Sequence, residues 1–537
     1  AIDRQRETGR IDPKIYGHFL ESSFFGNIEG GVFDEGSALA IDEPGIRNGF
    51  RRDVLELCRD LGIPIVRWPG GNFTSPYHWQ DGIGPRDERP RRLELAWGGL
   101  ETNRFGTDEF LTWCHDVGAE AFLVHSCRDV DDAVRWVEYT NSSRDTTLTR
   151  QRAANGHPRP YGVRYWGVGN ETYGPWQMGH RSAEAYADDA REHARFMRLV
   201  DPSIEIVGVG APWSQEEWTR PLLERAGRFL DYISLHLYGA SLHLFGSSGG
   251  RDEYDAVVAQ PLYFEQRIHD YAHLIAELAR EVGVERPLAL ALDEWNIRHL
   301  EPAAWPEPLP SDDGGTADRD LSAEGDGPPY RVNRWSPRTL ADALFYAGVF
   351  NALHRASSLP VPPTMANTVN LVNANGLIAA RPGGAVKSAS YHVWDLYQNH
   401  TGSIALETTV ETPARTAAVR QGDQRERGGE HQTRPGVVPT LDVSATSTAD
   451  RGSLRIAVIN RHLTESVDTA IVLDGRRLPA RASVRQIGAD VDDPFAGNGL
   501  SAPDRVALRD VGEVVLEDGR YSFPPHSVTV LSVALDR

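Results

Sequence analysis

The sequence predicts an α/β protein, a (β/α)8 or TIM barrel followed by a C-terminal antiparallel β-sandwich, and two observations lead to this fold class. From about residue 15 to residue 396, eight short apolar runs alternate with amphipathic helical patterns. After residue 397 the helical patterns end, and short β-branched runs separated by turn residues follow. Runs that are apolar on both faces are typical of parallel strands covered on both sides. Eight strand–helix units therefore favour a closed barrel, with a doubly wound open sheet as the second possibility.

The eight runs give the expected barrel strands in chain order. They read IYGHFL, IPIVRW, AFLVHS, VRYWGVGN, IEIVGVG, YISLHLY, LALALDEW and MANTVNLV. Between them, residues 50–61 place apolar side chains at every third or fourth position, and residues 185–200 and 271–282 show the same helical spacing. Asp201-Pro202 ends the second of these helices, because proline cannot continue a helix.

We expect residues 15–396 to form the barrel and residues 397–537 the β-sandwich, with residues 1–14 adding a strand to the sandwich. The runs SLRIAVINR, TAIVLDG, ASVRQIG and HSVTVLSVAL give the strands of this second domain. Two polar stretches, Pro302–Pro329 and Gln421–Pro439, interrupt the patterns and are predicted to be surface loops. The first stretch follows the seventh strand, so we expect it at the rim of any pocket formed there.

Composition excludes several kinds of partner. The chain carries 76 Asp and Glu against 56 Lys and Arg, a formal net charge of −20 at pH 7. Such a surface repels phosphate groups, so neither nucleic acid nor an anionic membrane is an expected partner. Three Cys without a CxxC pair predict neither a disulfide scaffold nor a Cys-rich zinc site. No apolar run approaches the ~18 residues of a membrane span, and the first residues lack the apolar segment of a secretory signal, so the expected compartment is the cytoplasm.

Two carboxylates are expected at one mouth of the barrel, because the active site of this fold lies at the carboxyl ends of its strands. Glu171 follows the fourth run and Glu294 ends the seventh. Such a pair suits glycoside hydrolysis, in which one group protonates the leaving oxygen and the other attacks the anomeric carbon or activates water. A strand-end Glu often serves only in a salt bridge. Finding two of them favours an enzyme over a non-catalytic sugar-binding protein on the same scaffold.

Other strand-end residues suit sugar binding. Candidates for stacking on sugar faces are Trp68, Trp97, Tyr238, Trp295 and Trp305, although Trp68 and Trp97 also suit packing. Candidates for bonding hydroxyls are Asn72, Asn170 and Asn370. The histidines show no HExxH motif and no ligand-spaced cluster, and GVGNETYG lacks the spacing of a phosphate loop. We therefore expect no metal, nucleotide or other cofactor.

The motifs IYGHFLE, VRWPGGNFTSPYHWQDGIGPRDERP, LAWGGLETNRFGTDEF, YWGVGNETYGPWQMGH, SLHLY and LDEWNI resemble those of glycoside hydrolase family 51, whose members are mostly α-L-arabinofuranosidases. The resemblance runs in order from about residue 15 to residue 396. It implies a (β/α)8 barrel with a β-sandwich and hydrolysis with retention of anomeric configuration. By the same resemblance, Glu171 is the general acid/base and Glu294 is the nucleophile.

The resemblance also implies a set of substrate-binding residues, which are Glu21, Arg67, Asn72, Trp97, Asn170, His236 and Tyr238. The hydroxyl of Tyr238 is expected to orient Glu294. Asn170 is expected to hold the 2-hydroxyl of the sugar, a contact that strengthens in the oxocarbenium-like transition state. Members of this family are often oligomers, so a homo-oligomer is a further expectation from the resemblance.

The chain departs from the family pattern in two places. After HFLE, the segment Ser22–Gly36 reads SSFFGNIEGGVFDEG where many members read HLGR, and Asn370 stands where many have a Gln that contacts the sugar. Both departures affect substrate recognition more than acid/base chemistry. We therefore expect a retaining exo-acting hydrolase of terminal α-L-arabinofuranosyl residues in oligosaccharides or glycosides. A β-D-galactofuranosidase, an α-D-arabinofuranosidase and an endo-β-glucanase remain open.

Overall fold

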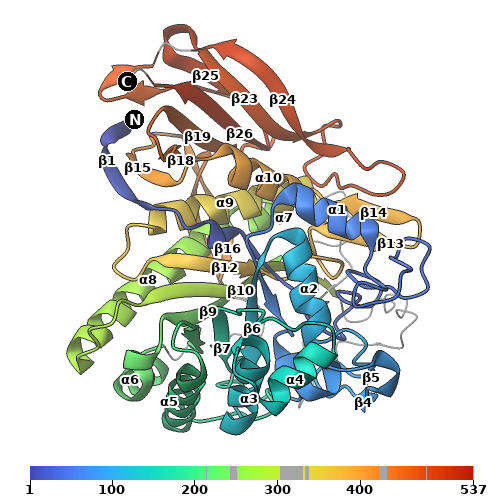
Figure 1. The fold of residues 1–537 in the computed structure, drawn as a ribbon. Helices are drawn as coiled ribbons and strands as arrows, with labels where there is room; N and C mark the ends of the chain where they lie inside the picture. Colours follow the sequence, from blue (N-terminus) through green and yellow to red (C-terminus); the bar gives the residue numbers. More distant parts are fainter. Residues whose placement is uncertain are drawn as a thin grey trace.

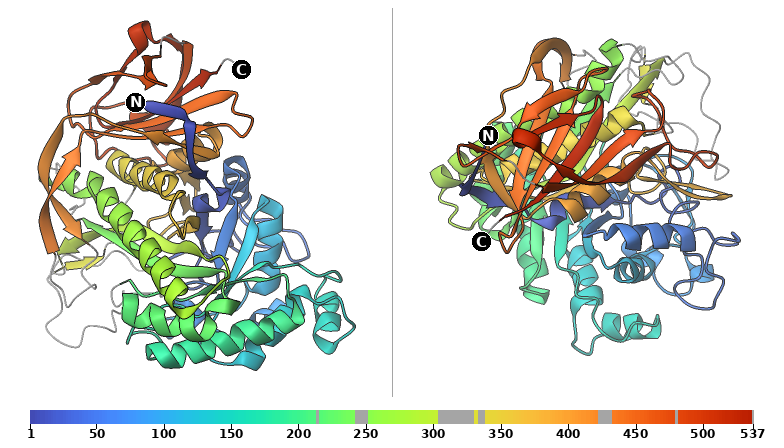
Figure 2. Two further views of the ribbon diagram at one scale, coloured as in Figure 1. Left: turned by 90° about the vertical axis from the view of Figure 1, so that its left-hand side faces the viewer. Right: turned by 90° about the horizontal axis from the view of Figure 1, so that it is seen from above.

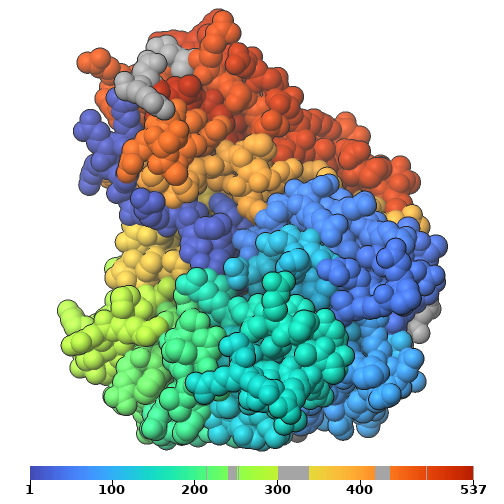
Figure 3. Space-filling model, in the orientation of Figure 1, coloured from blue at the N-terminus to red at the C-terminus, as the bar shows by residue number. Residues whose placement is uncertain are grey.

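The computed structural model describes residues 1–212, 215–241, 251–302, 330–332, 338–421, 432–478 and 481–535. A closed barrel of parallel strands occupies the N-terminal part of the chain, and an antiparallel sheet domain lies against it (Figure 1). The orange and red C-terminal residues form a continuous layer over the blue-to-green barrel in Figure 3. No helix in the described part of the chain is both long enough and apolar enough to cross a membrane.

The barrel has eight strands, and each lies in or overlaps one of the eight apolar runs. They are β2 (Gly17–Phe19), β3 (Ile65–Trp68), β6 (Glu120–His125), β7 (Tyr165–Val168), β8 (Glu205–Gly208), β9 (Tyr232–Ser241), β10 (Ala289–Pro302) and β12 (Pro363–Thr368). Each strand pairs in parallel with the next, and β12 pairs with β2, which closes the barrel. The predicted barrel is therefore confirmed, and the open doubly wound sheet is excluded.

Helices surround the barrel, as the periodic segments between the strands predict (Figure 2). They are α1 (Arg52–Leu61), α2 (Thr107–Val117), α3 (Val130–Asn141), α4 (Thr147–Ala154), α5 (Ala183–Val200), α6 (Gln215–Ala226), α7 (Arg251–Val258), α8 (Gln260–Val282), α9 (Leu340–Ala356) and α10 (Tyr391–His400). Helix α1 buries Val54, Cys58 and Leu61 on one face. It ends at Gly62, which takes the left-handed backbone (φ 76°) that places its N–H on the carbonyls of the last turn.

Side chains from seven of the strands fill the inside of the barrel. This inner cluster consists of Ile65, Phe122, Val124, Tyr165, Val207, Tyr232, Ala291 and Met365. The larger outer cluster, which includes Leu290, Leu292 and Trp295 of β10, packs between the strands and the helices. A strand that contributes to both clusters is apolar on both faces, which is the pattern that predicted the barrel.

The C-terminal domain is built on a nine-stranded sheet with the order β22-β21-β1-β15-β18-β19-β26-β23-β24. Its strands are β1 (Ile2–Arg10), β15 (Ile404–Thr408), β18 (Leu441–Ser447), β19 (Ser453–Asn460), β21 (Val472–Leu473), β22 (Arg476–Arg477), β23 (Arg481–Ala489), β24 (Val506–Val515) and β26 (Ser527–Ala534). A pair of short strands, β20 (Val467–Ala470) and β25 (Arg520–Phe523), forms a separate small sheet. The N-terminal strand β1 pairs antiparallel with β15, so both ends of the chain lie in this domain.

The two polar stretches have different outcomes. Residues 303–329 of the Pro302–Pro329 stretch, with Trp305, lie outside the described residues. In the second stretch, β17 (Gln432–Pro439) pairs antiparallel with β16 (Ala414–Gln421), so the prediction of a surface loop is wrong for that half. The remaining short strands are β4 (Arg92–Leu93), β5 (Leu100–Glu101), β11 (Tyr330–Val332), β13 (Ile378–Arg381) and β14 (Gly384–Lys387).

Candidate active site

A β-bulge in β10 determines which side chains reach the barrel mouth. Between the pairs Ala291↔Ser234 and Glu294↔His236, β10 advances by three residues while β9 advances by two. A bulge adds one residue to a strand and changes the direction of the side chains after it. Ala291 faces the inner cluster, and Leu292 and Trp295 join the outer one. The two residues between them, Asp293 and Glu294, both contact Arg67 and His236, so two consecutive carboxylates face the same site.

Glu294 is buried among three hydrogen-bond donors. The Tyr238 hydroxyl donates to Oε1 at 2.7 Å, His236 Nδ1 lies 2.8 Å from Oε2, and Arg67 Nη1 lies 3.4 Å from Oε2. Burial alone would raise the pKa of Glu294, but the charges of His236 and Arg67 and the Tyr238 hydrogen bond hold it well below its usual range. Glu294 is therefore ionised at neutral pH, as a carboxylate nucleophile must be.

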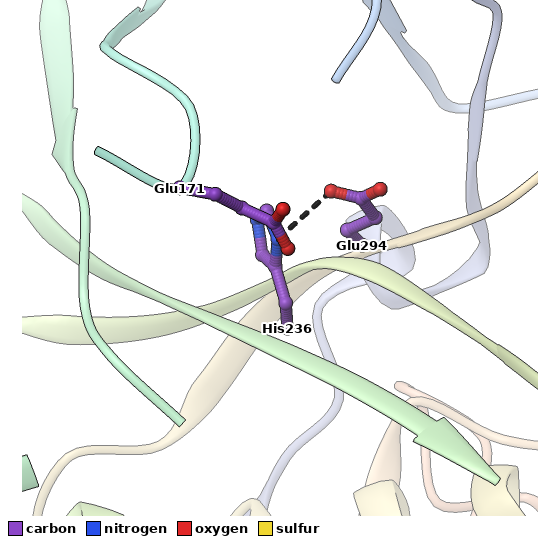
Figure 4. Close-up of side chains that lie close together, drawn as sticks. All are labelled: Glu171, His236 and Glu294. Atoms are coloured by element: carbon purple, nitrogen blue, oxygen red, sulfur yellow. Dashed lines mark hydrogen bonds and ion pairs between the residues drawn. The ribbon is translucent and has the colours of Figure 1, made fainter. Parts of the chain in front are cut away.

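Glu171 follows β7 and reaches toward Glu294 from the other side of the site (Figure 4). Its backbone is left-handed (φ 44°), which is uncommon for a residue other than glycine. Tyr173 donates to Oε1 at 3.2 Å and the Trp176 indole donates to Oε2 at 3.1 Å. His236 Nδ1 lies 3.0 Å from Oε1. The His236 ring therefore stands between the two glutamates and contacts both.

Arg67 and Asn170 form the floor of the site beneath Glu294. Arg67 is fully buried, and its Nη2 donates to Asn170 Oδ1 at 2.6 Å. That bond fixes the amide of Asn170, and the Nδ2 of the same amide is buried with no hydrogen-bond partner among the described residues. A buried donor without a partner costs about 1–3 kcal/mol. Asn170 therefore has a free donor for a substrate hydroxyl.

The two glycines of the WPGG motif bring the backbone close to the acidic groups. The N–H groups of Gly71 and Phe73 both donate to Glu21 Oε1 at 3.0 Å. A Cβ added at Gly70 would lie 2.4 Å from Glu21 Cγ, and one added at Gly71 would lie 3.2 Å from Glu294 Oε1. Burial raises the pKa of Glu21 to about 8, outweighing the Phe73 hydrogen bond that lowers it. At pH 7 the carboxyl is therefore protonated and can donate to a sugar hydroxyl.

Trp97 and Asn72 lie on the loops beside Glu21. The Trp97 backbone N–H donates to Glu94, its ring meets the Phe24 ring edge-on at 4.6 Å, and its indole interacts with the Glu21 carboxyl. Asn72 begins the short helical turn after Gly71 and is partly exposed. The departing segment Ser22–Gly36 therefore supplies, through Phe24, part of the packing around a predicted sugar-binding residue.

Two predicted binding residues are placed differently. Trp295 is fully buried in the outer cluster, where its ring stacks on Trp394 at 5.9 Å and meets Tyr346 at 5.7 Å. It belongs to the packing around the barrel, and the prediction that it stacks on a sugar is not supported by its position. Asn370 follows β12 and donates to the Ala374 carbonyl at 2.8 Å, and among the described residues no hydrogen bond joins it to either glutamate.

The sequence reasoning assigned no role to three side chains that contact the acids. Tyr173 and Trp176 bond Glu171, and Asp293 contacts both cations beside Glu294. The signal for the first two was the YGPW segment one residue after the Asn-Glu pair, since residues two and five positions on from a turn can fold back over it. Asp293 was visible at the end of the seventh run, but strand alternation gave no reason to place it beside Glu294.

One cluster in the described part of the chain brings three carboxylate or imidazole ligand atoms together. It consists of Glu171, His236 and Glu294, with one atom from each lying within 4.8 Å of the others. His236 Nδ1 already lies within hydrogen-bond distance of both glutamates. The three side chains therefore form one hydrogen-bonded group.

Comparisons with known proteins show which family the chain resembles over its whole length. The model of the α-L-arabinofuranosidase 1 domain matches residues 57–256, and that of the α-L-arabinofuranosidase C-terminal domain matches residues 293–527. Alpha-L-arabinofuranosidase C of Emericella nidulans is 34% identical over 99% of this chain and 96% of its own length. The intracellular exo-alpha-(1->5)-L-arabinofuranosidase of Streptomyces lividans is 30% identical over 97% of this chain and 73% of its own length.

A solved structure extends the likeness to the whole fold. The thermostable GH51 α-L-arabinofuranosidase of Thermotoga petrophila superposes with a TM-score of 0.81 at 32% identity, covering 99% of both chains. Full-length similarity at this level, together with both family models, covers the barrel and the sheet domain alike. The chain therefore belongs to the α-L-arabinofuranosidases of glycoside hydrolase family 51, and it is a glycoside hydrolase.

Proposed function

We propose that the chain releases terminal α-L-arabinofuranosyl residues by double displacement, with Glu294 as nucleophile and Glu171 as general acid and base. The observation that carries this proposal is the convergence of the two carboxyl groups from β7 and β10 on one imidazole, with oxygens within 4.8 Å of each other. Retaining glycosidases hold their carboxyl groups about 5–5.5 Å apart, whereas inverting ones leave about 6.5–9.5 Å for a water molecule. The close approach supports retention.

In the first step, an oxygen of Glu294 forms a bond to the anomeric carbon as the bond from that carbon to the leaving oxygen breaks. Glu171 gives its proton to the leaving oxygen, so the aglycone departs as a neutral alcohol. In the second step, Glu171 takes a proton from water, and the oxygen of that water replaces Glu294 on the anomeric carbon. Tyr238 and Arg67 hold the Glu294 carboxylate in place before and after this exchange.

The glycone is proposed to lie between Glu21, Asn170 and the Gly70-Gly71 backbone. Glu21 is protonated at neutral pH and Asn170 has an unused buried donor, so each offers a hydrogen bond to a hydroxyl. Trp97 is proposed to cover the sugar from the loop beside Glu21, with Asn72 next to it. Asn370 is retained in this set as a residue of the loop after β12, and Trp295 is not.

The choice of α-L-arabinofuranose and of exo action is supported by the relatives, several of which carry the name α-L-arabinofuranosidase and one of which is named as exo-acting. The Streptomyces lividans relative is also named as intracellular, which supports our proposal of a cytoplasmic location.

A panel of p-nitrophenyl glycosides tests the substrate. We expect kcat/KM to be highest on the α-L-arabinofuranoside, and lower on the β-D-galactofuranoside, the α-D-arabinofuranoside and the β-D-xyloside. A higher value on any of the other three would replace the proposed sugar. Methanolysis monitored by NMR tests the stereochemistry, because a retaining enzyme gives the methyl α-furanoside as first product, and the β-anomer would contradict the proposed mechanism.

A further inference from the structure

Asp293, directly before the nucleophile, has no part in the proposed bond-making steps, yet it is buried in the site. Its exposed fraction is 3%, and the bulge in β10 turns it toward the same side as Glu294. Its carboxylate lies 3.4 Å from His236 Nε2 and 3.5 Å from Arg67 Nε. A buried carboxylate is costly unless charges and donors compensate it. Two cations compensate this one, and both also contact Glu294.

His236 has a carboxylate on each side of its ring. Nδ1 lies 2.8 Å from Glu294 and 3.0 Å from Glu171, while Nε2 faces Asp293. A carboxylate beside each ring nitrogen favours the charged imidazolium, in which both nitrogens carry a hydrogen. Burial works to lower the pKa of His236, but the charges of Glu294 and Asp293 raise it well above its ordinary value. The geometry and the charges therefore agree that His236 is a cation at neutral pH.

The charges of these five groups balance in both stages of a retaining reaction. Before bond cleavage, Glu171 is protonated, and the anions Glu294 and Asp293 balance the cations His236 and Arg67. In the glycosyl-enzyme, Glu294 is a neutral ester and Glu171 has become the anion, so the same two cations again face two anions. The negative charge has moved from Glu294 to Glu171, and His236 Nδ1 contacts both positions. Asp293 is the anion that stays in place throughout.

We propose that Asp293 is a positioning residue whose fixed negative charge keeps His236 protonated and Arg67 in place during both steps, so that the His236 Nδ1–H follows the charge from Glu294 to Glu171. This inference rests on the proposed roles of the two glutamates. It gives the bulge in β10 a chemical purpose, because only the extra residue allows adjacent carboxylates to face the same two cations.

Other titratable groups face this set. Glu21, from the loop after β2, faces Glu294 and is neutral at pH 7 because burial raises its pKa to about 8. Tyr238 bonds Glu294, the Arg298 guanidinium stacks 3.5 Å from the Tyr238 ring centroid, and Tyr186 of α5 faces Asp293. All of these groups are kept when Asp293 alone is changed.

The pH profile of Asp293→Asn tests the proposal, since asparagine keeps the shape and removes the charge. Without the negative charge of Asp293, His236 loses its proton at a lower pH. The alkaline limb of the pH profile of kcat/KM on the p-nitrophenyl α-L-arabinofuranoside should therefore shift to lower pH by about 1–3 units. We expect kcat to fall at least tenfold while KM changes little, because Asp293 does not contact the substrate. An alkaline limb at the native position would overturn the proposal.

Asp342→Asn is the matched control. Asp342 is a buried carboxylate that also contacts a histidine of β10 and an arginine, His299 at 2.7 Å and Arg338 at 3.6 Å, but away from the two glutamates. Its change should lower stability and leave the alkaline limb in place. If both variants shifted the limb equally, the effect would reflect general destabilisation and Asp293 would have no special role.

A second measurement needs no variant. In enzyme labelled with ¹⁵N-histidine, the His236 ring should remain doubly protonated above pH 8, both free and after a 2-deoxy-2-fluoro arabinofuranosyl substrate has trapped the ester on Glu294. Loss of the proton on trapping would overturn the inference and leave the proposed function intact. Failure of the trap to label Glu294 would instead contradict the proposed function.

Discussion

Strand β10 contributes one residue to each of two buried sets of histidine, aspartate and arginine, one at the barrel mouth and one at the start of helix α9. The mouth cluster is Asp293, His236 and Arg67, with contacts of 3.4 and 3.5 Å from the aspartate to the two cations. The helix cluster is Asp342, His299 and Arg338.

The aspartate of the helix cluster is more tightly bound. Asp342 contacts His299 at 2.7 Å, and it also accepts the Thr339 backbone N–H at 2.7 Å and the Thr339 hydroxyl at 3.0 Å, which caps α9. In the mouth cluster both cations are shared with a second carboxylate, Glu294. A carboxylate whose bonds are all used locally stabilises a helix end. Cations shared between two carboxylates can instead respond when one of the two loses its charge. The same side-chain types therefore serve structure in one place and chemistry in the other.

The largest expected effect follows from removing Glu294, the proposed nucleophile, which the cations of the mouth cluster contact. Glu294→Ala should reduce turnover of the p-nitrophenyl α-L-arabinofuranoside by about 10⁴-fold or more, or ~5.5 kcal/mol in barrier, because no group remains to form the ester. Steady-state kinetics measures this, with circular dichroism as the control for folding. A loss below about tenfold, or ~1.4 kcal/mol, would remove Glu294 from the role of nucleophile.

Glu171→Ala should have a smaller effect that depends on the leaving group. Without a proton donor, substrates with poor leaving groups should slow by about 10²–10⁴-fold. Aryl substrates with acidic phenols should slow much less in the first step, because their departing oxygen needs little protonation. A series of aryl and alkyl arabinofuranosides gives the comparison. Equal slowing across the series would count against the acid assignment.

Asp342→Asn should affect stability and leave activity per folded molecule unchanged. Breaking one partner of a buried ion pair costs about 3–5 kcal/mol. Burial raises the pKa of Asp342, but the charges of His299 and Arg338 hold it well below its usual range. Its stabilising contribution is therefore present above the unfolded pKa of about 3.9 and is lost as pH falls through the folded value. Denaturant unfolding at several pH values should show a weaker loss of stability in acid for the variant than for the native chain. Parallel curves would contradict this role.

Trp295→Phe should have the smallest effect, because its side chain packs in the outer cluster although the residue directly follows Glu294. We expect a loss of about 1–3 kcal/mol in the free energy of unfolding. KM on the arabinofuranoside should stay at the native value, and Trp97→Phe is the matched comparison for an aromatic side chain proposed to cover the sugar. A tenfold rise in KM for the Trp295 variant would return that residue to the binding site.

Much of the fold could be predicted because strands that are buried on both faces consist mainly of apolar residues. Barrel strands are apolar on both faces, and each of the eight runs corresponds to a strand. Glu171 and Glu294 could be found because a polar residue at the end of such a run must leave the core at the barrel mouth.

The predictions that failed did so for physical reasons that cannot be seen in a local sequence pattern. Trp295 is misplaced because the bulge in β10 interrupts the alternation of side chains that a regular strand would show. Strand β17 has two prolines and a glycine among its eight residues, which weaken its strand propensity, and it pairs with β16 all the same. The contacts of Glu171 with Tyr173 and Trp176 depend on a turn in which Glu171 itself has a left-handed backbone, and the sequence does not predict that conformation for a glutamate.

The bulge also limits how this strand can change. Deleting one residue at Asp293 or Glu294 would remove the register shift against β9, and one of the two carboxylates would be lost from the site. Such a strand would lose either the nucleophile Glu294 or the positioning carboxylate Asp293. The enzyme therefore keeps an irregular strand in its barrel, and its activity depends on the number of residues in β10 as much as on which residues they are.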